Sequence, residues 1–235
     1  MNAILTARRV RKSFGATPAL RDADLAVDAG EVVAVMGPSG SGKSTLLHCL
    51  AGILRPDEGV VTFNGRELSA MSENERTLVR RDHFGFVFQF GQLVPELPVM
   101  QNVMLPLLLA GRSRRVARER AGILLERLDI AGLGRRRPGE LSGGQAQRVA
   151  VARALVTSPE VVFADEPTGS LDSLAGEQVM DLLLTAAREQ GTAVVLVTHE
   201  ARIAACTDRE ILVRDGVVID QAHPSVPVPV PGHER

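Results

Sequence analysis

The chain has 235 residues, of which 45% are hydrophobic and 23% charged, and its formal net charge is −1. This composition is typical of a globular α/β domain, and the near-neutral charge gives no general electrostatic case for nucleic-acid binding. The N-terminus lacks a signal-peptide layout, and no run approaches the roughly 18 apolar residues of a membrane span. Cys49 and Cys206 match no metal or redox spacing, so we expect two buried thiols in a cytosolic protein.

The first third of the chain is rich in predicted strands. Residues 23–27 alternate between polar and apolar side chains, and residues 31–36 are nearly all apolar, as in a buried central strand of a parallel sheet. A strand over 60–63 followed by Asn64-Gly65 predicts a β-hairpin. Phe14 lies upstream of these strands, and two roles stay open for it: stacking on adenine and packing into a core.

A glycine-rich loop follows the strand at 31–36 and precedes a helix predicted over 43–54. It fits the phosphate-loop pattern G-x-x-x-x-G-K-[ST] in full. Backbone N–H groups would approach phosphate oxygens, Lys43 would reach the β- and γ-phosphates, and the Ser44 hydroxyl would bind Mg²⁺. The alternative is a loop without a ligand. The predicted nucleotide-binding residues are Gly37, Pro38, Ser39, Gly40, Ser41, Gly42, Lys43, Ser44 and Thr45.

Residues 84–90 alternate phenylalanine with other residues. This period of two predicts a strand that packs its phenylalanines on one face. Gln89 then falls on the opposite face at the end of the strand. There it would touch Mg²⁺ or the attacking water and sense whether the site is occupied.

Residues 91–158 lack the strand-like pattern of the preceding residues and are predicted to be a helical insertion in the sheet domain. An amphipathic helix is expected over 116–130, with Ile123, Leu124 and Leu128 on one side and the Arg and Glu side chains on another. Arginines cluster at 112–120 and 135–137 without interleaved aromatic residues. A solvated helical face is therefore favoured over a nucleic-acid surface.

A second glycine motif, Leu141-Ser142-Gly143-Gly144-Gln145, precedes a helix-forming stretch at 146–155. It would present backbone N–H groups, a hydroxyl and a helix N-terminus to an anion. Because the phosphate loop already provides one anion site, this second site suggests the ATP of another subunit.

The last third carries the remaining chemistry. A buried strand at 161–164 runs into Asp165 and Glu166, and ligands bind at this end of parallel strands. Asp165 would complete the Mg²⁺ shell, and Glu166 would act as general base on the attacking water. His199 ends the strand at 193–198 and would hold the γ-phosphate and the water.

Further elements complete the prediction. A helix at 178–190 between the strands at 161–164 and 193–198 predicts a βαβ crossover. Residues 211–213 and 217–219 are expected to form a terminal hairpin. The alternation of Pro and Val near the C-terminus predicts a disordered tail over 223–235.

Taken in order, these motifs resemble the ATPase subunit of an ATP-binding cassette (ABC) transporter. The resemblance covers residues 6–219 and implies an α/β fold: a P-loop NTPase (RecA-like) core with an N-terminal antiparallel β subdomain and an inserted α-helical subdomain. The implied domain is 1–222, with the core and β subdomain at 1–89 and 159–222 and the helical insertion at 90–158.

The resemblance implies a head-to-tail dimer with a second ATPase subunit, expected to be a homodimer, with ATP and Mg²⁺ between the two subunits. In that arrangement each ATP contacts the phosphate loop of one chain and Ser142, Gly143, Gly144, Gln145 and Asp172 of the other. Residues 102–107 are similar to the macrolide-exporter, lipoprotein-releasing and FtsE-like branch. Its ATPases pair with an integral-membrane permease that has an extracytoplasmic domain, which implies a cytoplasmic protein on the inner face of the cell membrane.

Several residues depart from the common pattern of the family. Phe14 replaces a usual Tyr, Ala146 replaces a frequent Gln, and Gln101 replaces a common Glu. Gln89 is followed by Phe90-Gly91-Gln92, so the loop expected to face the membrane partner has side chains of its own kind, and this departure bears on which partner the chain binds.

Two other functions remain open. An FtsE-like ATPase would move or sense a membrane partner without transport. A soluble DNA-repair ATPase shares the second glycine motif, but such proteins insert long coiled coils, and here only about a hundred residues without sustained heptads separate Lys43 from Ser142.

Overall fold

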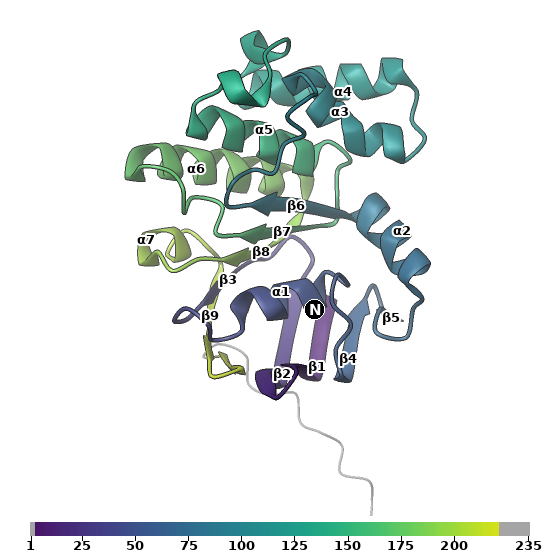
Figure 1. Ribbon diagram of the computed structural model, residues 1–235, viewed down its shortest axis with the longest axis vertical. Helices are drawn as coiled ribbons and strands as arrows, with labels where there is room; N and C mark the ends of the chain where they lie inside the picture. Colours follow the sequence, from purple (N-terminus) through teal and green to yellow (C-terminus); the bar gives the residue numbers. More distant parts are fainter. Residues whose placement is uncertain (1–2, 221–235) are drawn as a thin grey trace, which may run out of the picture.

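The computed structural model describes residues 3–220, whose strands form two sheets (Figure 1). The smaller sheet is antiparallel, with the strand order β2-β1-β4-β5. Its strands are β1 (Ala3–Phe14), β2 (Thr17–Asp28), β4 (Glu58–Phe63) and β5 (Arg66–Glu67). The predicted hairpin is confirmed as β4–β5, and Asn64 and Gly65 adopt the positive φ angles, 48° and 73°, that a tight two-residue turn requires.

The larger sheet has six strands in the order β10-β9-β3-β8-β7-β6. All neighbouring strands are parallel except β9 and β10, which form the predicted terminal hairpin. Its strands are β3 (Val32–Met36), β6 (Phe84–Phe88), β7 (Val161–Asp165), β8 (Ala193–Val197), β9 (Arg209–Arg214) and β10 (Val217–Asp220). This arrangement confirms the predicted α/β fold class.

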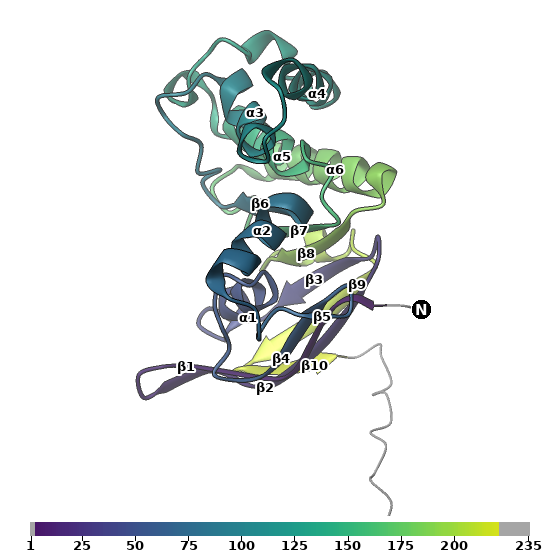
Figure 2. The same cartoon turned by 90° about the vertical axis from the view of Figure 1, so that its right-hand side faces the viewer.

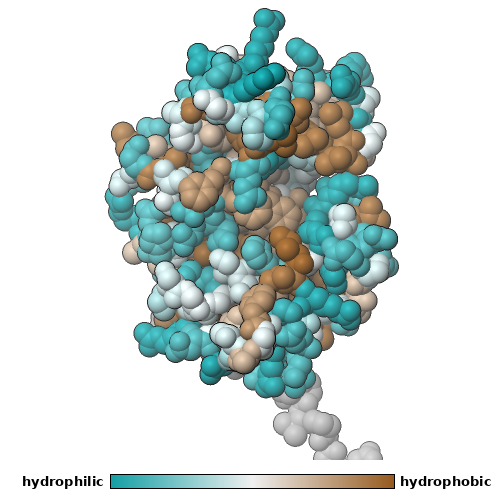
Figure 3. Space-filling view, in the orientation of Figure 1, coloured by the Kyte–Doolittle hydropathy of each residue, from teal (hydrophilic) through white to brown (hydrophobic). Residues whose placement is uncertain are grey.

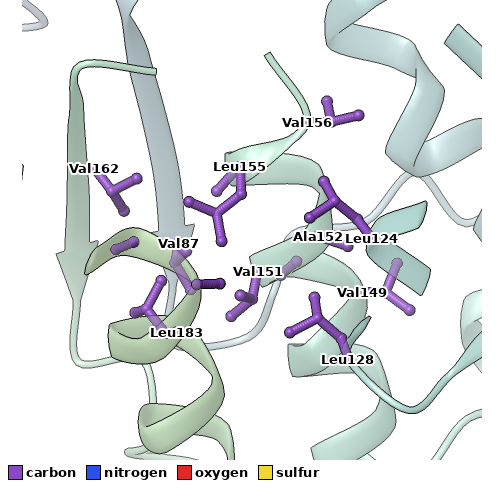
Figure 4. Packing of buried hydrophobic residues seen from close by; sticks show 14 of the residues in the cluster. Val87, Leu124, Leu128, Val149, Val151, Ala152, Leu155, Val156, Val162 and Leu183 are labelled. Carbon is purple, nitrogen blue, oxygen red and sulfur yellow. The ribbon is translucent and has the colours of Figure 1, made fainter. Parts of the chain in front are cut away.

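The central strands are apolar throughout because a hydrophobic core lies on each face of the large sheet. Val161 belongs to the core shared with the antiparallel sheet, whereas its neighbour Val162 belongs to the core under the helices. Figure 4 shows this second core, in which Val162 lies near Leu155 and Leu183. Burial on both faces explains why these strands read as continuous apolar runs instead of alternating ones.

Helices fill the connections between the strands. They are α1 (Lys43–Leu50), α2 (Glu73–His83), α3 (Val99–Leu109), α4 (Arg114–Arg127), α5 (Gly143–Leu155), α6 (Ser173–Gln190) and α7 (Ala201–Ala204), with 3-10 turns η1 (Ala131–Leu133) and η2 (Pro138–Glu140). In Figure 2, α3 and α4 gather at the end of the molecule opposite the antiparallel sheet, and α5 and α6 lie between them and the large sheet. The predicted helical segment 90–158 therefore holds α3, α4 and α5.

Four local expectations were wrong. The helix expected over 43–54 ends at Leu50, because Gly52 takes a positive φ of 64°. On α4, Ile123 is 52% exposed and does not share the buried side of Leu124. Phe90 lies beyond the end of β6 and is 76% exposed, so it is not part of a packed phenylalanine face. Cys206 is exposed, unlike Cys49. The predicted tail at 223–235 lies outside the described residues.

Asn102, on α3, is the buried polar residue that shapes the segment before that helix. Its side-chain oxygen accepts a hydrogen bond from the Val94 N–H at 2.8 Å, and its amide nitrogen donates to the Val94 and Leu97 carbonyls at 3.0 and 2.9 Å. The side chain is fully buried. Asn102 thus satisfies backbone groups that no strand or helix pairs.

Replacing Asn102 with Ala should lower the free energy of unfolding by about 2–4 kcal/mol, because it leaves buried backbone groups without partners and opens a small cavity. Urea unfolding monitored by circular dichroism measures this loss. Gln101→Ala, at the exposed neighbouring position, is the matched control and should change the free energy by less than about 0.5 kcal/mol. Equal effects of the two substitutions would contradict the assigned role of Asn102.

Candidate functional site

The carboxyl ends of four parallel strands lie side by side at one edge of the large sheet. Val35 of β3 and Asp165 of β7 both pair with Val197 of β8, and Phe88 of β6 pairs with Asp165. The segments that follow these strand ends carry the phosphate loop, Gln89, Glu166 and His199. The strand register therefore assembles motifs that are far apart in the sequence at the edge where parallel sheets bind ligands.

The phosphate loop is compact and holds its lysine inside. Lys43 is 7% exposed, and its ammonium donates to the Gly37 and Pro38 carbonyls, both at 2.9 Å. The Ser41 hydroxyl is buried, and among residues 3–220 it has no hydrogen-bond partner. A loop with a buried cation and an unsatisfied hydroxyl is suited to an anion that would accept hydrogen bonds from both.

Neighbouring strands press closely on this loop. Gly42 has a φ of 105°, and a Cβ there would lie 2.3 Å from the Ala19 carbonyl oxygen of β2. On another side, the Gly216 N–H donates to the Ser41 carbonyl at 2.9 Å. Only glycine at position 42 permits both this backbone conformation and the close approach of β2.

Ser44 and Asp165 meet directly in front of the loop. The Ser44 hydroxyl donates to the Asp165 carboxylate at 3.2 Å. Burial raises the pKa of Asp165 above its usual value, the nearby Glu166 charge raises it further, and the Ser44 hydrogen bond opposes the rise. A cation placed here would favour the ionised carboxylate.

Glu166 and His199 form the next pair along the sheet edge. The Glu166 carboxylate lies 3.4 Å from His199 Nδ1. Glu166 has a φ of 45°, which is uncommon for a residue with a side chain, and its N–H donates to the Val197 carbonyl at 3.0 Å. The backbone is thereby turned so that the side chain, which is partly exposed, meets the histidine.

Gln89 lies at the adjacent strand end, one residue beyond β6. A Cβ on Gly169 would come within 2.8 Å of the Gln89 amide nitrogen, so this side chain lies against the loop that follows Glu166. The Ser170 hydroxyl of that loop donates a hydrogen bond to the backbone carbonyl of Gln89 at 2.8 Å. The structure thus links Gln89 to the segment between Glu166 and Asp172.

Phe14 is 53% exposed at the end of β1, which rules out the alternative of core packing. Its partner in the hairpin is Thr17, and β2 continues from there to Ala19, which touches the phosphate loop. The ring is therefore an exposed aromatic surface at the tip of the hairpin whose second strand touches the phosphate loop.

The helix at the second glycine motif starts earlier in the chain than predicted. Helix α5 starts at Gly143 instead of Ala146, so both glycines lie in its first turn. The Ser142 hydroxyl accepts from the Gln145 N–H at 3.3 Å, and the Gln145 side chain accepts from the Ser142 N–H at 3.1 Å. This capping box leaves the first helical N–H groups and the proton of the Ser142 hydroxyl for an anion.

A polar hollow of about 440 Å³ opens in front of this helix end. Its lining includes Ser142, Gly143, Gly144, Gln145, Arg148 and Asp172. Asp172 caps α6 by accepting from the Ala175 N–H at 2.9 Å. No phosphate-loop residue and neither Asp165, Glu166 nor His199 belongs to the lining found among residues 3–220. The structure therefore does not bring the second glycine motif and the first together within one chain.

Helix α5 carries two polar residues that the sequence reasoning missed. Gln147 donates to the Phe88 carbonyl at 2.9 Å, and Arg153 donates to the Gly91 and Gln92 carbonyls at 2.6 and 2.7 Å. Burial lowers the pKa of Arg153. The available signal was polar residues on the buried side of a helix, but their backbone partners lie some sixty residues away, so no local pattern reveals them.

Glu200 is another residue that was missed. Its carboxylate accepts from the Thr168 hydroxyl at 2.8 Å, and this joins the segment after His199 to the loop after Glu166. Its place directly after His199 was the only signal in the sequence.

The residues present fit a nucleotide with Mg²⁺. The Ser41 hydroxyl lacks a partner within the described chain, and the Lys43 ammonium meets only carbonyls of its own loop. Ser44 and Asp165 supply the hard oxygen ligands that Mg²⁺ prefers, and the metal usually completes its shell with phosphate and water. Among residues 3–220 no cluster of three or more His, Cys, Asp or Glu side chains could hold a metal by itself.

Known proteins resemble this chain over most of its length. The family model described as ABC transporter matches residues 20–169. The lipoprotein-releasing system ATP-binding protein LolD of Porphyromonas gingivalis is 43% identical over 218 residues, which cover 93% of this chain and 100% of LolD. The macrolide export ATP-binding/permease protein MacB of Rhodopseudomonas palustris is 48% identical over 201 residues, or 86% of this chain, but these are only 30% of MacB.

Solved structures agree with these relatives. The dimeric structure of MJ0796, a bacterial ABC transporter cassette, matches with a TM-score of 0.84 at 40% identity. The match covers 91% of this chain and 96% of the MJ0796 chain. A second structure of MJ0796, a dimer in a post-hydrolysis state with ADP and Pi, has the same TM-score at 39% identity. With its motifs, its fold and these relatives in agreement, the chain belongs to the ABC transporter family, as an ATP-binding and ATP-hydrolysing subunit.

Proposed function

We propose that this chain hydrolyses ATP at two sites shared between two copies in a head-to-tail dimer. The carrying observation is that the two anion-binding elements do not meet in one chain. The hollow in front of Ser142 contains no residue of the phosphate loop. A second copy, turned head to tail, would place its phosphate loop opposite that hollow and complete two equal sites.

Each predicted residue then has a role at the edge of the large sheet. Lys43 and the loop amides bind the phosphates, and Phe14 stacks on the adenine. Ser44 and Asp165, with Gln89, hold Mg²⁺, which supplies charge neutralisation for the phosphates when bound. Glu166 takes the proton of the attacking water. His199 is supported in its role by its position 3.4 Å from Glu166, where it orients the carboxylate and can donate to the γ-phosphate.

The other copy contributes the first turn of its α5 helix. The N–H groups of Gly143 and Gly144 and the Ser142 hydroxyl would bind the γ-phosphate, aided by the positive end of the helix dipole. Gln145 and Asp172 would act chiefly by shaping this surface, since both serve as helix caps or capping partners.

The partner that receives the motion is an integral-membrane permease with an extracytoplasmic domain. Within residues 3–220 no helix is long and apolar enough to cross a membrane. Figure 3 shows apolar side chains gathered over part of the helical layer. Leu109, the last residue of α3, and Phe90 are large apolar residues that are exposed. The names of the relatives, a lipoprotein-releasing subunit and an exporter, favour transport over FtsE-like mechanical signalling. Such a subunit acts in the cytoplasm on the inner face of the cell membrane.

Glu166→Gln should retain ATP binding but lower the rate of hydrolysis by about 100-fold or more, because the general base is lost. The ATP-bound dimer should then persist and be visible in gel filtration. Phosphate release measures turnover, and calorimetry measures binding. Glu160→Gln, at the opposite end of β7, is the matched control and should keep normal turnover. Near-normal hydrolysis by Glu166→Gln would remove Glu166 as the base.

Ser142→Arg should leave ATP binding by an isolated chain within about threefold, while dimer closure and hydrolysis are lost, because a bulky cation fills the hollow that faces the other copy. The substitution also removes a helix cap worth about 1 kcal/mol. Ser113→Arg removes the corresponding cap of α4 and controls for that cost. Hydrolysis that survives in Ser142→Arg, or is lost equally in Ser113→Arg, would contradict the shared site.

A further inference from the structure

The tip of the β1–β2 hairpin projects from the rest of the antiparallel sheet (Figure 2). The pairing of β1 with β4 ends at Arg11 and Glu58, whereas β1 and β2 stay paired to Phe14 and Thr17. Residues 13–18 are all exposed. The segment that carries Phe14 is therefore a two-stranded ribbon, and such a ribbon holds its shape weakly by itself.

Asp57, which directly precedes the first residue of β4, continues the support of β1 beyond that strand. The Asp57 carboxylate accepts from the Ser13 N–H and from the Lys12 ammonium, both at 2.7 Å. The Asp57 N–H in turn donates to the Arg11 carbonyl at 2.9 Å. These bonds tie three successive residues of β1, and the last of them directly precedes Phe14.

The Ser13 N–H faces away from β2, on the side where a third strand would lie. The Asp57 carboxylate takes the place of that strand's carbonyl. Hydrogen bonds from Lys12 and then from the Ser13 backbone hold the pKa of Asp57 below its usual value. The Lys12 and Asp57 side chains are 17% and 47% exposed, so this pair is more sheltered than the neighbouring Arg11–Glu58 pair, whose side chains are 49% and 68% exposed.

We infer that Asp57 is a positioning residue for ATP, which fixes the end of β1 so that the Phe14 ring is preoriented to stack on adenine. This inference rests on the adenine-stacking role proposed for Phe14. Without the Asp57 bonds, the ring would remain on the chain, but part of the binding free energy would be spent on ordering the hairpin.

The test compares two ligands, because only one of them has a base. Calorimetry measures the Kd of adenylyl imidodiphosphate and of inorganic tripolyphosphate, each with Mg²⁺. Asp57→Ala should weaken the nucleotide about three- to tenfold and leave tripolyphosphate unchanged, since a stacked base contributes roughly tenfold or more. In turnover assays KM for ATP should rise, and kcat at saturating ATP should not change.

Four further variants make the result specific. Glu58→Ala breaks the adjacent ion pair with Arg11 and is the matched control, with no expected change in either Kd. Asp57→Asn keeps an oxygen for the Ser13 N–H and should recover part of the affinity. Phe14→Ala combined with Asp57→Ala should bind the nucleotide no more weakly than Phe14→Ala alone, because the two residues act through one contact.

The outcomes distinguish a failure of the Asp57 role from a failure of the adenine-stacking role of Phe14. Equal weakening of both ligands by Asp57→Ala, or additive losses in the double variant, would overturn the positioning role of Asp57. If Phe14→Ala changes neither Kd, the adenine role of Phe14 itself fails. Thermal unfolding of each variant without ligand shows whether a general loss of stability accounts for the changes.

Discussion

The register of the central parallel sheet is the constraint on which the rest of the structure depends. Each strand is buried on both faces, with Val161 in one core and Val162 in the other. A slip of one residue would send each side chain into the wrong core, so packing specifies the register strongly. That register places Val35, Phe88, Asp165 and Val197 level with one another. The geometry of the site is thus a consequence of hydrophobic packing behind it.

Helix α5 connects the second glycine motif to the segment that carries Gln89. Its first turn carries the second glycine motif, and its body holds the segment after β6 through Gln147 and Arg153. Gly85 makes this possible, because a Cβ there would lie 2.4 Å from the Ala154 carbonyl oxygen. A displacement of the helix N-terminus by a ligand would therefore be passed to the segment that begins with Gln89. The exposed Phe90 lies in that segment, one residue beyond Gln89.

The two anion-binding elements differ in how complete they are. The phosphate loop has a buried lysine, a buried hydroxyl without a partner in the described chain, and a carboxylate within reach of Ser44. The start of α5 has a completed capping box and an open hollow in front of it. The first element can bind an anion alone, whereas the second needs a ligand presented from outside the chain. This asymmetry is the physical argument for the proposed head-to-tail dimer, and the solved cassettes of similar fold are dimeric.

The sequence by itself determined the α/β class, the order of the motifs and the candidate residues, because these follow from local patterns: a phosphate loop between strand and helix, or paired carboxylates after an apolar strand. It also placed the β4–β5 hairpin, since Asn64-Gly65 has a strong local turn preference. Helix ends were less accurate, as at Leu50 and Gly143, because capping depends on individual φ angles and side-chain bonds. Only the tertiary structure decided that Phe14 and Phe90 are exposed, that α5 holds the segment after Phe88, and that Asp57 supports the end of β1. Those contacts join residues tens of positions apart, and no local periodicity encodes which of them fold together.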